Sequence, residues 1–121
     1  MTDRDNHLIR KIVISTGAVT TVAGTGSSGS ANGTGTSASF NGPTGISTDG
    51  TNLYLADYNN HLIRKIVIST GAVTTVAGTG SSGSANGTGT SASFYNPIAI
   101  TTDGTNLYVA DFDNHLIRQI E

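Results

Sequence analysis

The chain has 121 residues, a net charge of −2, only 12% charged residues and no cysteine. The weak charge argues against recognition of nucleic acid or a membrane surface through charge alone, and the lack of cysteine excludes a disulfide framework or a thiolate metal site. No apolar run approaches the roughly 20 residues that a membrane-spanning helix needs. The many Gly, Ser, Thr and β-branched residues favour strands and loops over helices, and none of these features indicates a cellular compartment.

A nearly exact tandem repeat is the main feature of the sequence. The 35 residues from Asn6 to Phe40 recur letter for letter from Asn60 to Phe94, with a period of 54 residues. Residues 41–59 recur with changes as 95–113, and a third copy begins at Asn114. Such identity indicates a very recent duplication or an engineered sequence, and we expect an engineered or truncated piece of a longer repeat array.

Each repeat contains four short runs that are typical of strands. The runs are rich in β-branched and aromatic residues, and turn residues such as Asp49-Gly50-Thr51 separate them. In the complete repeat the predicted strands are Pro43–Thr48, Asn52–Ala56, His61–Ile68 and Ala72–Ala77. The third of these has apolar residues on both faces, which predicts a sheet packed between two neighbouring sheets. We therefore expect four-stranded antiparallel meanders.

In chain order, these strands divide the sequence into three parts. Residues 1–40 hold a third and a fourth strand plus a long loop, residues 41–94 hold a complete unit plus a second long loop, and residues 95–121 hold the first three strands of another unit. The loops are much longer than the five or six extended residues needed to cross a unit about 15 Å wide. We expect them to fold over one face, with Phe94 and Pro97 as anchors, and to be functional or mobile.

The segment DYNNHLIRKI, from Asp57 to Ile66, closely resembles the NHL repeat, which is named for its Asn-His-Leu triplet. The resemblance covers nearly the whole chain and implies a β-propeller, typically with six blades. The two departures are Ala99, where the first copy has Gly45, and Gln119, where the other copies have lysine. The residues that carry the repeat signature, which we expect to be structural, are Asn6, His7, Asp57, Asn60, His61, Asp111, Asn114 and His115.

A chain with about two blades of strands cannot close a ring alone. It would expose apolar faces and strand edges, and such surfaces associate. We expect an all-β propeller whose ring closes by oligomerisation, with six blades from three chains favoured and four or eight blades as alternatives. One third strand in each chain is then surplus. Either Asn6–Ile14 or Asn114–Glu121 lies outside the ring, or the two copies compete for one place by strand exchange.

Four patterns resemble functional motifs. Gly24–Gly29 and Gly78–Gly83 match G-x-G-x-x-G, but no helix is predicted after them to bind a pyrophosphate. The three histidines would have to converge from separate blades to bind a metal, so we expect them to bond turn backbone instead. Asp57, His61 and a serine lack a nucleophile elbow, and we expect no catalytic triad. The recurring third-strand arginines are expected to cover blade edges and to pair with aspartate or face water.

The prediction for function is a self-assembling scaffold with no catalytic, cofactor-binding or metal-binding residues. Its expected partner is itself, with no nucleic acid and no membrane. One alternative is a module that binds a peptide or glycan through its loops, and the candidate residues are Ser27, Ser28, Asn32, Ser81, Ser82 and Asn86. A second alternative is a metal-dependent lyase of the kind that occurs among NHL-type propellers. It is disfavoured because the positions that differ between copies offer no convincing catalyst.

Overall fold

The computed structural model describes residues 1–121 as an all-β protein of three antiparallel sheets, whose only helices are 3-10 turns of three residues. No helix has the length and apolar character that crossing a bilayer requires. The strands are β1 (Thr2–Asp3), β2 (Leu8–Ile12), β3 (Val19–Ala23), β4 (Gly33–Thr34), β5 (Pro43–Thr48), β6 (Asn52–Asp57), β7 (Leu62–Val67), β8 (Ala72–Ala77), β9 (Pro97–Thr102), β10 (Leu107–Asp111) and β11 (Leu116–Ile120). The 3-10 turns are η1 (Arg4–Asn6), η2 (Gly35–Ser37), η3 (Tyr58–Asn60), η4 (Gly89–Ser91) and η5 (Phe112–Asn114).

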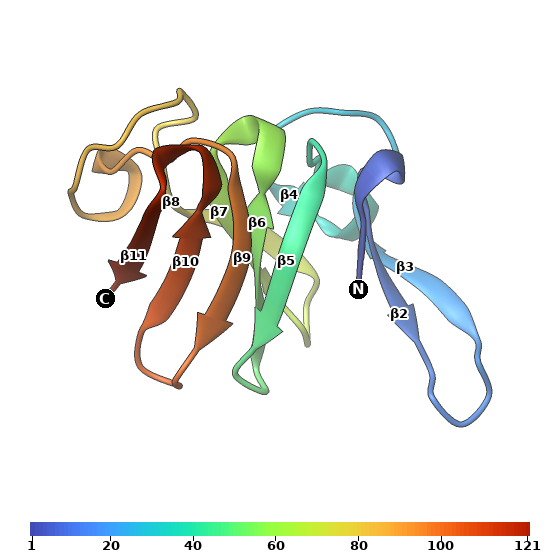
Figure 1. The fold of residues 1–121 in the computed structure, drawn as a ribbon. Coiled ribbons are helices and arrows are strands. Elements are labelled where there is room, and N and C mark those ends of the chain that lie inside the picture. Colours follow the sequence, from blue (N-terminus) through green and yellow to red (C-terminus); the bar gives the residue numbers. More distant parts are fainter.

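The three sheets stand side by side (Figure 1). The first sheet has the order β1-β2-β3, the middle sheet β4-β8-β7-β6-β5 and the last sheet β11-β10-β9. The expected all-β, blade-like architecture is thereby confirmed. The middle sheet is the complete meander, with β5 and β8 at the predicted bounds, β6 one residue longer and β7 one residue shorter at each end. The two-residue strands β1 and β4 were not predicted.

Turn chemistry explains the meander. At the β5–β6 turn, the Asp49 carboxylate accepts hydrogen bonds from the backbone N–H of Thr51 (2.9 Å) and Asn52 (2.7 Å). At the β6–β7 turn, His61 takes a left-handed conformation with φ of 57°, which reverses the chain after η3. Such short polar turns fix which residues pair, so that Leu53 lies opposite Ile66 and Ala56 opposite Ile63.

Two apolar clusters lie between the sheets, and they are built from equivalent residues of successive repeats. Between the middle and last sheets, Ile63, Ala77 and Phe94 pack against Ile100, Leu107 and Val109. Between the first and middle sheets, the cluster is made of Ile9, Ala23, Ala38, Phe40, Leu55, Ile66 and Val73. Ile63 therefore faces one neighbour and Ile66 the other, which confirms the predicted burial of the third strand on both faces.

The same residue is buried in one repeat and exposed in another where a neighbouring sheet is missing. Ile12 is 47% exposed, although its equivalent Ile66 is fully buried. At the other end of the chain Ile117 is 77% exposed, although its equivalent Ile63 is fully buried. Because each residue and its two chain neighbours are identical in the repeats compared, the exposure reflects the absent neighbouring sheets and not a change of residue.

Candidate functional site

A buried ion pair lies at the centre of the repeat signature. Asp57 at the end of β6 accepts a hydrogen bond from Arg64 of β7 at 2.8 Å, and both side chains are fully buried. Asp57 also accepts hydrogen bonds from the backbone N–H of Asn41 (2.8 Å) and the Nδ2 of Asn60 (2.8 Å). Burial raises the pKa of Asp57, while the Asn41 and Asn60 donors and the Arg64 charge oppose that shift.

Arg64 links this pair to the long loop that precedes the middle sheet. Its guanidinium donates to the carbonyls of Ser39 and Ala31 and to the Oδ1 of Asn32, each at 3.0 Å. The guanidinium carbon also lies 5.1 Å from the centre of the Phe40 ring. Asn60 supports the same loop by donating to the Gly29 carbonyl at 2.7 Å. The signature residues of one blade therefore clamp the loop that arrives from the blade before it.

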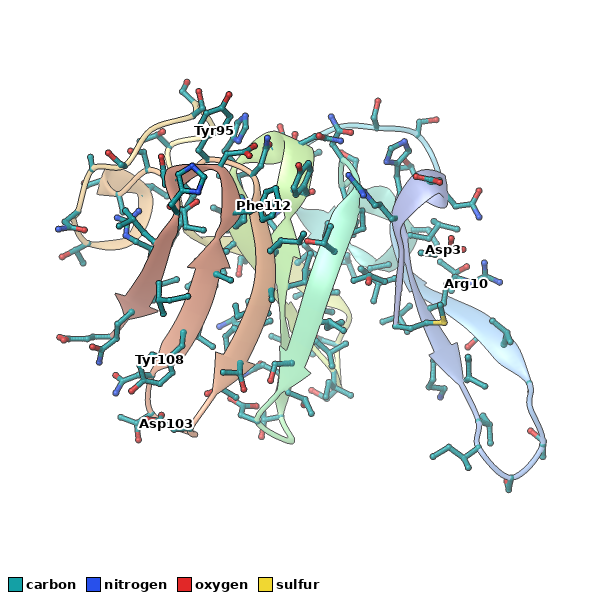
Figure 2. All side chains as sticks on the ribbon, in the orientation of Figure 1. Asp3, Arg10, Tyr95, Asp103, Tyr108 and Phe112 are labelled. Atoms are coloured by element: carbon teal, nitrogen blue, oxygen red, sulfur yellow. The ribbon has the colours of Figure 1, made fainter.

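The three copies of this clamp differ in completeness. Asp111 and Arg118 pair at 2.9 Å, and Arg118 holds the second long loop through Ser93, Ala85 and Asn86. Asp3 and Arg10 pair at 3.1 Å with side chains 26% and 28% exposed, and no loop covers them. In Figure 2 these two residues lie in the first sheet, on β1 and β2.

Arg64 and Arg118 were not among the predicted signature residues. The sequence analysis assigned the recurring arginines to blade edges and to pairing with aspartate or contact with water. The pairing with aspartate occurs, but the arginines of the last two copies are buried clamps and do not lie at solvated edges. The available signal was the recurrence of Asp and Arg seven residues apart in all three copies.

The histidines have separate structural contacts. The Nδ1 of His7 accepts a hydrogen bond from the Gly42 N–H at 3.0 Å, and the Nδ1 of His61 accepts one from the Asn96 N–H at 3.1 Å. His115 has the same left-handed backbone but is exposed. No group of three His, Cys, Asp or Glu side chains gathers anywhere in the chain.

The candidate ligand-loop residues divide into two kinds. Asn32 and Asn86 each accept a hydrogen bond from a clamp arginine, so they hold the loop in place. The other four, Ser27, Ser28, Ser81 and Ser82, are exposed at the loop surface. Phe94 and Pro97 are buried where the second loop re-enters the fold. The G-x-G-x-x-G segments lead into loop and 3-10 turn, and no α-helix follows them.

Two hollows mark places where strands are missing. The first, which we call the inner-strand gap, is a cavity of about 600 Å³ between the first and middle sheets; its apolar lining residues are Met1, Ile12, Val22, Ile46, Leu53 and Ile68. The second, the outer-strand slot, is a cavity of about 420 Å³ between β11 and the second long loop; residues that line it include Asn86, Gly87, Thr88, Arg118, Gln119 and Ile120.

No protein-family model matches the chain. Among curated proteins, the chain is 42% identical over 83 residues to Protein SUPPRESSOR OF QUENCHING 1, chloroplastic, of Arabidopsis thaliana. It is 37% identical over 84 residues to NHL repeat-containing protein 2 of Bos taurus. Each match covers 65% of this chain but only 8% and 12%, respectively, of the relative, so the chain spans a small part of these proteins.

Among solved structures, a protein of unknown function from Bacteroides thetaiotaomicron superposes with a TM-score of 0.91 at 28% identity. The superposition covers 98% of this chain and 31% of that one. An auxiliary nutrient binding protein from Bacteroides ovatus superposes with a TM-score of 0.82 at 28% identity, again over 98% of this chain and 33% of that one. Each solved chain is therefore about three times as long as the region that this chain matches.

Proposed function

Because this chain is an NHL-repeat protein of the β-propeller type, we propose that it associates with further copies of itself into a closed ring and serves as a scaffold without catalysis of its own. The observation that carries this proposal is the inner-strand gap. It is an apolar hollow beside the first sheet, which lacks full-length equivalents of the strands β5 and β6 of the middle sheet.

Residues of the last sheet fit this gap. In the middle sheet, Ala56 is fully buried against the last sheet and Tyr54 packs against the same cluster. Their repeat equivalents, Ala110 and Tyr108 of β10, are only partly buried and face away from the middle sheet. Within one chain, Tyr54 and Ala56 lie against Ile100 and Leu107. The last sheet of a second copy can place Tyr108 and Ala110 in the same way against Ile46 and Leu53, which are the repeat equivalents of Ile100 and Leu107.

The number of copies follows from the length of the repeat. Two periods of 54 residues use 108 of the 121 residues, and the 13 residues that remain repeat a third strand and its approach. Three copies supply six blades, and the solved relatives, which are about three times as long as the matched region, support that number. In such a ring each apolar face meets a complementary face, which closed symmetry requires.

The first test is the solution mass by light scattering after size-exclusion chromatography. Three chains of 12.3 kDa give about 37 kDa, and a mass of two or four chains would change the blade number but keep the self-association. A folded monomer of 12.3 kDa at micromolar concentration would overturn the proposal. Ala110→Glu places a charge in the contact between copies and should give a folded monomer. Thr105→Glu, in the exposed β9–β10 turn, is the control and should leave the mass unchanged.

The second candidate function is a binding module, and the superposition on auxiliary nutrient binding proteins favours it. The exposed serines of the two long loops, which come from equivalent positions, would form its surface. Replacement of Ser27, Ser28, Ser81 and Ser82 by alanine distinguishes the two functions. A scaffold keeps its mass and stability after this change, whereas a binder loses its ligand in a glycan or peptide array.

A further inference from the structure

The first long loop completes the outer edge of the middle sheet. Its residues Gly33 and Thr34 form β4, which pairs with β8 so that Gly33 lies opposite Val73 and Thr34 opposite Ala72. The backbone N–H of Gly35 donates to the Gly71 carbonyl at 2.9 Å, and the Thr75 hydroxyl donates to the Oδ1 of Asn32 at 3.3 Å. A loop from one blade therefore supplies a fifth strand to the blade that follows.

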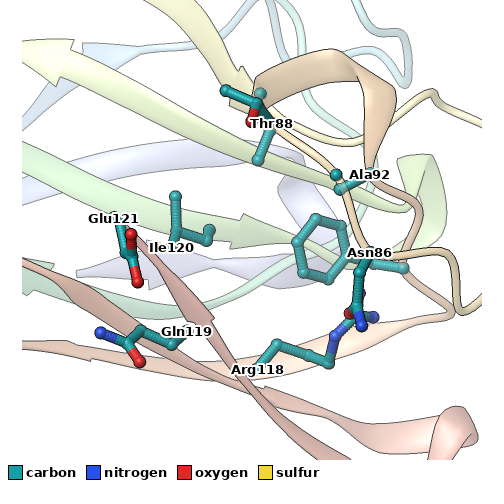
Figure 3. Close-up of a pocket in the computed structure, with 11 residues that line it drawn as sticks. Asn86, Thr88, Ala92, Arg118, Gln119, Ile120 and Glu121 are labelled. Atoms are coloured by element: carbon teal, nitrogen blue, oxygen red, sulfur yellow. The ribbon is translucent and has the colours of Figure 1, made fainter.

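The second long loop has the same sequence but no strand beside it. Gly87 and Thr88, the equivalents of Gly33 and Thr34, line the outer-strand slot and pair with no strand. Figure 3 shows Asn86 and Thr88 on the loop side of this slot and Gln119 and Ile120 of β11 on the other side. A fourth strand placed in the slot could pair with β11 on one side and with Gly87 and Thr88 of the loop on the other, because both segments have unpaired backbone groups.

The chain contains a second strand with the sequence of β8, and the outer edge of this strand is unpaired. Residues 15–24 read STGAVTTVAG, as do residues 69–78, which contain β8. Val19 of β3 is 47% exposed, whereas its equivalent Val73, which pairs with β4 and lies in the apolar cluster between the first and middle sheets, is 2% exposed. The outer-strand slot has room for a strand equivalent to β8. The strand β3 has the sequence of β8 but has no loop strand paired to its outer edge, as β4 is paired to β8.

We propose that the outer-strand slot binds β3 of a second copy, with Gly87 opposite Val19 and Thr88 opposite Ala18 of that copy. This inference rests on the proposed self-association and specifies its register. The pairing is the same whichever third strand is displaced, because either β11 or the incoming β2 can lie on the inner side of β3. The Thr21 hydroxyl of the incoming copy then donates to Asn86, as Thr75 does to Asn32.

Cysteine cross-linking tests this register directly, since the chain contains no cysteine. The Gly35–Gly71 hydrogen bond marks Thr34 and Ala72 as a non-hydrogen-bonded pair, which brings side chains close enough for a disulfide. The variant Ala18→Cys/Thr88→Cys should therefore form disulfides between copies on mild oxidation. On a non-reducing gel these should appear as covalent oligomers up to the number of chains in the ring.

Two variants are the controls. Thr34→Cys/Ala72→Cys should form its disulfide within one chain and migrate as a monomer. Ala18→Cys/Thr34→Cys joins positions that are not opposite each other and should give only collisional cross-links. If the protein is an oligomer by light scattering but Ala18→Cys/Thr88→Cys forms no more cross-links than the second control, the proposed register is overturned. The self-association would remain supported. A monomer by mass would overturn the self-association itself, and with it the register.

Discussion

Gly45 of β5 lies directly against the backbone of Ala99 in β9. A Cβ atom built on Gly45 would lie 2.7 Å from the Cα of Ala99 and 2.8 Å from the carbonyl oxygen of Ile98, closer than real Cβ contacts. The inner strands of the middle and last sheets can therefore approach only because residue 45 is glycine. Ala99 is the repeat equivalent of Gly45, and in a ring it would face Gly45 of the next copy with its methyl group in that space.

Ala99→Gly should therefore tighten the association between copies. Relief of overpacking is worth about 1–3 kcal/mol. Glycine in a strand costs about 0.5–1 kcal/mol relative to alanine, so the expected net effect remains favourable. We expect the dissociation constant, measured by light scattering across a dilution series, to fall several-fold. Gly45→Ala should instead destabilise the single chain. Weaker association of Ala99→Gly would mean that contacts between copies do not repeat the Gly45–Ala99 approach.

Removal of the clamp arginine should destabilise the fold strongly at one position and weakly at another. Arg64→Met leaves the Asp57 carboxylate buried without its charge partner, and loss of one member of a buried pair costs about 3–5 kcal/mol. Arg10→Met removes the equivalent pair where both side chains are partly exposed, and should cost less than about 1 kcal/mol. Urea unfolding midpoints of the two variants in the monomeric Ala110→Glu background measure this difference, because association between copies would change the exposure of Arg10. Equal losses would contradict the assignment of Arg64 as a loop clamp.

Much of the architecture could be predicted from the sequence because its strands carry local signals. Asp49-Gly50-Thr51 and the β-branched runs beside it specify a hairpin without reference to the rest of the chain. β4 could not be predicted in this way, since Gly33 and Thr34 become a strand only because β8 lies beside them. The burial of Arg64 was also missed, because it depends on a loop that begins about 40 residues earlier in the chain. Local patterns reveal hairpins, whereas contacts between blades require the assembled fold.

Two of the three equivalent histidines offer a matched pair for measuring what the contacts of one imidazole contribute to stability. His61 and His115 have φ of 57° and 58°, so alanine bears the same left-handed backbone cost at both positions. Of these two, only His61 accepts a hydrogen bond from a following N–H, that of Asn96, and its ring also lies edge-on to the Tyr95 ring at 5.6 Å between centroids. His61→Ala should therefore lose about 1–3 kcal/mol more than His115→Ala in urea unfolding of the monomeric Ala110→Glu background. Equal losses would show that neither the Nδ1 hydrogen bond nor the Tyr95 contact of His61 contributes to stability.

Two aspartates in equivalent turns should give the fold part of its acid sensitivity. Hydrogen bonds from the backbone of Asn52 and then Thr51 lower the pKa of Asp49, and those of Asn106 and Thr105 lower the pKa of Asp103 in the same way. A carboxyl whose pKa is lower in the folded chain stabilises the fold above its unfolded pKa. That stabilisation is lost as the pH falls through the folded pKa.

The double variant Asp49→Asn/Asp103→Asn keeps an oxygen acceptor in each turn but removes the two titrating groups. Its urea midpoint should therefore fall less than that of the parent chain between pH 6 and acid conditions near pH 3, because those two carboxyls no longer take up protons on unfolding. Asp5→Asn is the control, since Asp5 is exposed and the structure gives it no hydrogen bond, so this variant should follow the parent chain. Parallel curves for the parent chain and the double variant would mean that the turn hydrogen bonds do not couple protonation to folding.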